Sequence, residues 1–192
     1  MQKTIVVLDA CVLIPMPLCD TLLRAAEASL YRFHTSEQIL EETARNLAKI
    51  LGKRNKLEPK IAEEKAHKRV QQMKQAFPES LVEPKKEIIN ILKNDPKDRH
   101  VLAAAIEAKA DTIVTSNLSD FPQNTLKPYK IKAVSPDEFL VELVELSGQV
   151  KLVNILQQQA DDIDLNLDVL LDKLRQNGAN NFIKIISEFF DK

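Results

Sequence analysis

Apolar residues follow two different spacings along the first two thirds of the chain. Short runs rich in β-branched residues, which are typical of buried strands, cover residues 4–8, 111–115 and 130–134. Between them, apolar residues recur every three or four positions, as in amphipathic helices, over residues 18–31, 35–51, 59–77 and 95–109. This alternation predicts an α/β fold with a mostly parallel sheet sandwiched between helices.

Capping residues suggest where several of these helices begin and end. Thr35 and Gln38 have the pattern of a capping box, and Gly52 is expected to end the helix that they start. Asp95, followed by proline, predicts an N-cap, which puts Asp98 in the first turn at the positive end of the helix dipole. Residues 135–138 open another helix with the same chemistry.

Strand patterns stop after Gly148, and helical spacing continues over residues 150–159, 165–176 and 181–190. We therefore expect an α/β domain over residues 1–147 and a C-terminal helical extension over residues 148–192. Apolar positions at helical spacing favour packing against the first domain. A dimer contact or a partner site is the alternative for the same helices.

The composition excludes several classes of protein. The chain has only three glycines in 192 residues and no phosphate-binding glycine motif. Cys11 and Cys19 lack zinc-site spacing and are expected to be reduced thiols in a cytoplasmic protein. No segment resembles a signal peptide or approaches the roughly 20 apolar residues that span a bilayer. We expect no membrane association.

Positive charge is concentrated in one segment. The net charge is −1, yet residues 45–74 contain ten basic and three acidic residues. One interpretation is a solvated helix surface. The other is a surface that attracts phosphates beside an acidic site, which makes Arg45, Lys49, Lys53 and Arg54 candidate substrate-binding residues.

Carboxylates from four separate segments are placed to meet at one edge of the predicted sheet. Asp9 ends the first strand, Asp120 follows the strand at 111–115, Asp98 begins the preceding helix, and Glu42 lies early in another helix. Clustered carboxylates need protons or cations, and oxygen ligands suit Mg²⁺ or Mn²⁺. The pattern predicts metal-assisted phosphodiester hydrolysis, with Asp9, Asp98 and Asp120 as metal ligands.

Each of these acids also has a purely structural interpretation: Asp9 and Asp120 as turn formers, Asp98 as a helix cap and Glu42 as a solvated helix residue. A second group of polar residues is expected to support the site: Asn117, Ser116, Asp95, Glu41 and Arg99. Ser116 serves a ligand or the turn, and Asp95 is interpreted as a cap. Arg99 is expected to pair with a neighbouring acid rather than with phosphate.

Four stretches together resemble the PIN-domain family, which includes the toxin ribonucleases of bacterial toxin–antitoxin pairs. They are IVVLDACVL (5–13), ILEETARNL (39–47), DPKDRHVLAAA (95–105) and TIVTSNLSDFP (112–122). The resemblance covers residues 3–146. It implies a three-layer α/β/α fold, dependence on a divalent metal and cleavage of single-stranded RNA. It also implies an antitoxin partner and frequent homodimers.

The resemblance assigns the acids by position in this sequence. Asp9 matches the first acid of the family, Glu42 the second with Glu41 as the fallback, and Asp98 the third. Many members carry Asp where this chain has Asn117, so Asp120 is expected to be the fourth acid. This departure leaves the choice between one metal and two open.

Two other functions stay open at this point. Because Asn117 replaces an acid, the chain is also interpreted as a catalytically inactive RNA-binding or interaction module that keeps the fold. A third hypothesis is a house-keeping nuclease for RNA processing or DNA repair, with no antitoxin.

Overall fold

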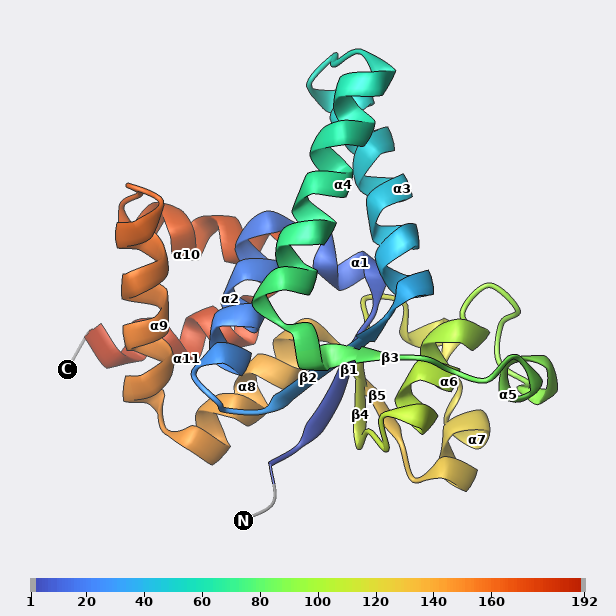
Figure 1. Cartoon of the computed structure of the whole chain (residues 1–192). Helices are drawn as coiled ribbons and strands as arrows, with labels where there is room; N and C mark the ends of the chain where they lie inside the picture. Colours follow the sequence, from blue (N-terminus) through green and yellow to red (C-terminus); the bar gives the residue numbers. More distant parts are fainter. Residues whose placement is uncertain (1–2, 191–192) are drawn as a thin grey trace.

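A five-stranded parallel sheet forms the centre of the computed structural model, which describes residues 3–190 (Figure 1). The strand order is β3-β2-β1-β4-β5. The strands are β1 (Ile5–Leu8), β2 (Arg32–Ser36), β3 (Leu81–Val82), β4 (Thr112–Val114) and β5 (Lys132–Val134). In the register, Val7 of β1 lies opposite His34 of β2 and Ile113 of β4. The predicted α/β class is confirmed.

Helices cover both faces of the sheet, with α6 and α7 on one side and α2 and the C-terminal helices on the other (Figure 1). The helices of the first part are α1 (Ala10–Leu13), α2 (Met16–Glu27), α3 (Glu37–Arg54), α4 (Pro59–Ala76), α5 (Lys86–Ile91), α6 (Arg99–Glu107) and α7 (Gln123–Leu126). The C-terminal helices are α8 (Pro136–Ser147), α9 (Gln149–Asp162), α10 (Leu167–Gln176) and α11 (Asn180–Phe190).

The central strands are continuously apolar because both of their faces are covered. Val6, Val7 and Leu8 of β1 are all fully buried, as are Ile113 and Val114 of β4. A strand with one solvated face would alternate apolar and polar residues. This packing fixes the position of whatever follows β1 and β4 at the carboxyl edge of the sheet.

The strand β2 was not predicted, and two expectations beside it were wrong. Thr35 belongs to β2, where it pairs with Leu81 of β3, so it does not cap a helix. Ser36 is the N-cap of α3, and its Oγ accepts a hydrogen bond from the Ile39 amide at 3.4 Å. The helix also continues past Gly52 to Arg54. Four of the five residues of β2 are polar, so its pairing with β1 and β3, not an apolar run, defines it.

The start of α6 also differs from the prediction. Asp95 does not cap this helix: its Oδ1 accepts a hydrogen bond from the Lys97 amide at 2.9 Å, in a local turn. The helix begins at Arg99, with Asp98 in the N-cap position. The capping box predicted at residues 135–138 is confirmed, with both of its reciprocal hydrogen bonds present at the start of α8.

Two 18-residue helices, α3 and α4, form a hairpin that projects from the body of the protein (Figure 1). Each helix is about 27 Å long, given a rise of 1.5 Å per residue. Small and apolar side chains, among them Ala44 and Leu47 on α3 and Ala62 and Ala66 on α4, are buried in the hairpin. At its base, Arg69 donates to the carbonyls of Leu13 and Ile14 at 2.7 and 2.9 Å.

The C-terminal helices share the hydrophobic core of the sheet domain. Leu152 and Leu156 of α9 are buried, and α9 packs on α2 and α8. Gln159 accepts a hydrogen bond from Thr21 Oγ1 at 2.6 Å. The boundary at residue 148 stays a prediction. Across residues 3–190, no helix combines the length and apolarity that crossing a membrane requires.

Candidate functional site

Asp9 lies at the carboxyl end of β1, in the N-cap position of α1, and only 3% of it is exposed. Its carboxylate does not cap the helix. Instead, Oδ2 accepts hydrogen bonds from Thr115 Oγ1 at 2.7 Å and from the Cys11 thiol at 3.1 Å. No donor among residues 3–190 bonds to Oδ1. A buried carboxylate held by one oxygen has its other oxygen free for a ligand.

Sequence reasoning missed Thr115 and Cys11, which hold Asp9. Thr115 is fully buried after β4, and its hydroxyl also accepts the Asn117 amide at 3.0 Å. Burial and the charge of Asp9 raise the pKa of the Cys11 thiol to about 11, so the thiol stays protonated and can donate. The Ser116 amide in turn donates to Cys11 Sγ at 3.2 Å. These bonds join the loops after β1 and β4.

Glu42 reaches the same region from the second turn of α3, which starts directly after β2. Asn46 Nδ2 donates to its Oε1 at 3.4 Å, and His100 Nε2 of α6 lies 3.1 Å from its Oε2. His100 was not predicted as a site residue. Glu41 is exposed, whereas Glu42 is partly buried and is among the groups that raise the pKa of Asp98, which favours Glu42 over Glu41.

Asp98 feels the charge of all the other predicted acids. Its side chain makes no capping hydrogen bond, although its backbone carbonyl accepts the Val101 amide at 3.1 Å. Partial burial, followed by repulsion from Asp9, Asp120, Glu42 and Asp95, raises its pKa to about 6. Carboxylates from three other segments are therefore close enough to act on the charge of Asp98.

Asp120 ends a 3₁₀ turn, η2 (Leu118–Asp120), and is half-buried. Its Oδ1 accepts a hydrogen bond from Ser119 Oγ at 3.3 Å. Asn117 and Ser116 are exposed in the loop that leads to this turn, and they bond to neighbouring residues through their backbone amides. Their side chains are thus available for a ligand.

Arg99 does not pair with an acid as expected. Its Nε donates to the Asn94 carbonyl at 3.4 Å, and it has no ion pair within the part of the chain that the structure describes. Arg99 therefore supports the turn before α6 and does not neutralise the carboxylates.

The donor set fits a hard divalent cation in its chemistry. Asp9, Asp98 and Asp120 offer carboxylate oxygens, which suit Mg²⁺ or Mn²⁺. Burial, and after it repulsion from Asp9 and Asp120, raises the pKa of Asp98, and a cation would relieve this repulsion. Among residues 3–190, however, no three His, Cys, Asp or Glu side chains are grouped closely enough to hold a metal ion. The acids interact by charge without being gathered at ligand distance.

A hollow of about 480 Å³ lies beside the acids, between α3 and α6. Glu41, Glu42, Arg45, Lys97 and His100 are among its lining residues. Of the predicted substrate-binding residues, Arg45 alone reaches this hollow. Lys49 and Lys53 lie nearer the C-terminal end of α3 and line a different hollow. Arg54 is exposed at the end of α3 and lines neither.

Comparison with known protein families identifies the family of this chain. The family described as PIN domain matches residues 5–119, which is more than half of the chain. The chain belongs to the PIN-domain family. The match includes Asp9, Glu42, Asp98 and Asn117 and ends one residue before Asp120. The resemblance drawn from the four sequence stretches is confirmed.

A curated relative is named "Putative ribonuclease VapC50" and comes from Mycobacterium tuberculosis (strain ATCC 25618 / H37Rv). The two chains are 52% identical over 70 residues, which is 36% of this chain and 41% of the relative. The match thus spans less than half of the relative's length. No solved structure gives a significant match.

Proposed function

We propose that this PIN-domain protein is a metal-dependent endoribonuclease that hydrolyses single-stranded RNA. The observation that carries the proposal is that Asp98 is partly buried and lies near enough to Asp9, Glu42 and Asp120 for burial and their charges together to raise its pKa to about 6. Carboxylate clusters of this kind are used to bind the cations that assist phosphodiester hydrolysis. Membership of the PIN-domain family supports the same class of reaction.

Each acid has a role that follows from its surroundings. Asp9, Asp98 and Asp120 would hold Mg²⁺ or Mn²⁺, which when bound polarises the scissile phosphate and lowers the pKa of water. Asp9 is the most rigid of the three because Thr115 and Cys11 fix its Oδ2. Glu42, whose Oε1 accepts a hydrogen bond from Asn46 and whose Oε2 lies 3.1 Å from His100 Nε2, would accept a proton from the attacking water.

The neutral Asn117 would contribute an amide oxygen where an acid would add further repulsion. Ser116, which is exposed beside it, would hydrogen-bond to the substrate or to a bound water. Asp95 adds negative charge at the rim of the site, since it is among the groups that raise the pKa of Asp98.

We further propose a toxin role in a toxin–antitoxin pair. The resemblance to toxin ribonucleases and the partial match to "Putative ribonuclease VapC50" support it. An antitoxin would then be a protein partner, and a homodimer is the expected oligomer. An RNA substrate and two free thiols, Cys11 and Cys19, fit the cytoplasm. The nuclease domain would comprise residues 1–147, with residues 148–192 as an integral helical extension.

The test is cleavage of a mixed-sequence single-stranded RNA by purified protein with Mg²⁺, Mn²⁺ or EDTA. Asp9→Asn and Asp98→Asn should each lower the rate at least about 100-fold, since each removes a charged ligand. Asp172→Asn is the matched control, because this exposed carboxylate lies on α10. Metal-dependent cutting that both site variants retain would refute the assigned acids.

Two further outcomes separate the rival functions. Folded protein that binds RNA equally well with and without EDTA, and that cuts under neither metal, would be a binding module. Cleavage without growth arrest on expression, and without a small co-encoded partner, would indicate a house-keeping nuclease.

A further inference from the structure

The projecting hairpin of α3 and α4 carries ten of the 27 lysines and arginines of the protein. Residues 45–74 hold ten basic and three acidic residues in a chain with a net charge of −1. Two of the ten are already engaged: Lys74 pairs with Glu37 at 2.6 Å, and Arg69 donates to backbone carbonyls at the base of the hairpin. The other eight basic side chains have no such partner among the residues that the structure describes.

These remaining bases are exposed, and none forms an ion pair with another residue in the range 3–190. They are Arg45, Lys49, Lys53, Arg54, Lys56, Lys60, Lys65 and Lys68. A surface that serves only solubility would mix both signs of charge. Here bases outnumber acids by ten to three over residues 45–74, on an arm that stands beside an acidic site.

Three of the bases continue the face of α3 that carries Glu42. Arg45, Lys49 and Lys53 follow it by three, seven and eleven residues. With 3.6 residues per turn, Lys49 and Lys53 lie within about 20° of Glu42 around the helix axis. The rise of 1.5 Å per residue puts Lys53 about 16 Å farther along it. We call Arg45, Lys49 and Lys53 the α3 stripe.

The stripe joins two hollows in the surface. Arg45 lines the hollow of about 480 Å³ that also contains Glu42 and His100. It also lines a second hollow, of about 460 Å³, between α3 and α4, together with Lys49 and Lys53. A path with cationic side chains therefore leads from the acid cluster toward the tip of the hairpin.

The chemistry of the hairpin favours nucleic acid over protein as its ligand. Ile61 is the one large apolar side chain exposed on residues 37–76, all of which the structure describes, whereas protein interfaces usually have an apolar core. Interfaces with nucleic acids are more polar and much more positive. Residues 37–76 also contain no Phe, Tyr or Trp on which bases could stack. Recognition would therefore depend on phosphates and not on base sequence.

We propose that the α3 stripe binds the backbone phosphates of the RNA strand that is cut at the acid cluster, so that the strand leaves the cluster along the hairpin. The position of the cut rests on the proposed function. The acids repel phosphates, so a neighbouring cationic track is needed to hold the strand in place. The phosphate contacts themselves require neither metal nor cleavage, which makes them separately measurable.

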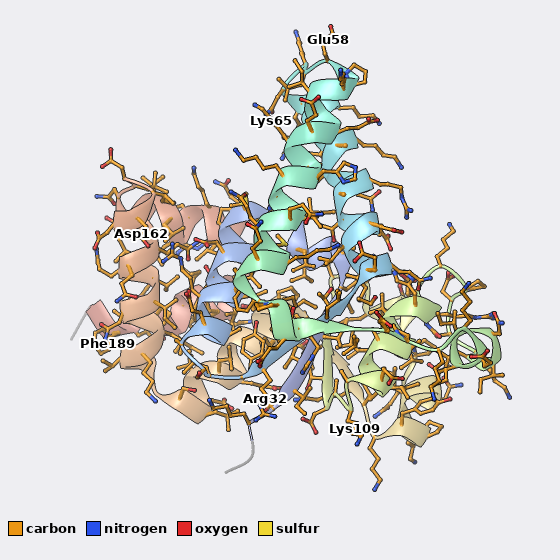
Figure 2. All side chains as sticks on the ribbon, in the orientation of Figure 1. Arg32, Glu58, Lys65, Lys109, Asp162 and Phe189 are labelled. Atoms are coloured by element: carbon orange, nitrogen blue, oxygen red, sulfur yellow. The ribbon has the colours of Figure 1, made fainter. Side chains whose placement is uncertain are left out.

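The experiment measures binding of a fluorescein-labelled oligouridylate of about 12 nucleotides by anisotropy, in EDTA and over a range of salt concentrations. The stripe variant is Arg45→Gln/Lys49→Gln/Lys53→Gln. The control is Lys65→Gln/Lys68→Gln/Lys151→Gln, which removes equal charge off the stripe. Figure 2 shows Lys65 on the side of α4 that faces away from α3. Thermal melts should match the wild type because all six side chains are exposed.

Loss of three phosphate contacts should reduce the slope of log K against log salt by about 2 and weaken binding about tenfold or more at low salt. The control should change the slope by less than half as much. Equal effects of the two variants, or none, would overturn the proposal. So would a stripe variant that binds RNA normally but loses binding of a polyglutamate peptide, which would identify an acidic protein as the partner.

Cleavage by the wild-type protein is measured in parallel. Stripe-dependent binding without any metal-dependent cutting would contradict the nuclease function and keep the stripe as an RNA-binding surface. Metal-dependent cutting, together with RNA binding that the stripe variant leaves unchanged, would contradict the role of the stripe but not the nuclease function.

Discussion

Asp137 connects the C-terminal helix α11 to the helix that follows the last strand, and replacing it tests whether the C-terminal helices are integral to the fold. Its Oδ2 accepts hydrogen bonds from the Asn181 amide at 3.1 Å and from Asn181 Nδ2 at 2.8 Å. Its Oδ1 accepts the Phe182 amide at 2.9 Å. The carboxylate is 9% exposed and thus caps the first turn of α11 from another helix.

The substitution Asp137→Asn keeps the shape but replaces one acceptor oxygen by an NH₂ group. In either orientation of the amide, a donor then faces a buried backbone N–H, which leaves a group unsatisfied at a cost of about 1–3 kcal/mol. Loss of the charge weakens the remaining bonds and removes a favourable interaction with the helix N-terminus of about 0.3–1 kcal/mol. We expect the free energy of unfolding to fall by about 2–4 kcal/mol. This corresponds to a decrease in Tm of about 5–15 °C.

Urea unfolding followed by circular dichroism measures this change. Asp172→Asn serves as the control, because its exposed pair with Arg175 should contribute less than about 1 kcal/mol. One cooperative transition that moves to lower urea would support a common core. A variant within about 0.5 kcal/mol of the control would refute the reasoning, as would early loss of α11 with an unchanged main transition.

Three further outcomes are expected. Asp98 has a folded-state pKa of about 6, above the ordinary carboxyl value of about 4, so the metal-free protein should lose stability as the pH rises between these values. Asp98→Asn should remove this loss and raise the free energy of unfolding near neutral pH by about 1 kcal/mol, after allowance for solvent screening. Thermal melts in EDTA at several pH values measure both effects. Thr115→Val should lower the free energy of unfolding by about 1–2 kcal/mol and the cleavage rate about tenfold, because Asp9 loses the hydroxyl that donates a hydrogen bond to it, whereas Thr115→Ser should restore both. Equal kinetics for the two variants would contradict this role. Arg69→Gln should lower the free energy of unfolding by about 1–3 kcal/mol, since two carbonyls at the end of α1 lose their donor, and an unchanged urea midpoint would count against that contact.

The elements predicted correctly are those with strong local patterns. β1 and β4 are apolar throughout because both faces are covered, and the box at residues 135–138 contains both of its partners within one turn. β2 was missed because most of its residues are polar and its pairing partners, β1 and β3, are distant in sequence. The start of α6 was misplaced because Asp95 can bond either to a helix or to a local turn, and the turn is formed.

Some residues of the candidate site could likewise be predicted from local patterns, and others could not. The acids could be named because strand ends and helix starts in a parallel α/β fold lie at one edge of the sheet. Cys11, Thr115 and His100 could not be assigned, because their roles depend on contacts across the fold: Thr115 Oγ1 reaches Asp9 at 2.7 Å from 106 residues away. The choice of Glu42 over Glu41 likewise depends on the rotation of α3 relative to α6.

By itself, the sequence determined the α/β class, the PIN-domain resemblance and the segments that supply the acids, since periodicity and short motifs are local properties. Only the tertiary structure decided which oxygen of Asp9 is held, how strongly the acids act on Asp98, and which hollows the bases of α3 line. Hydrogen bonds act over a few ångströms and charge interactions weaken with distance. These properties therefore depend on the distances between side chains, which the packing of helices on the sheet sets.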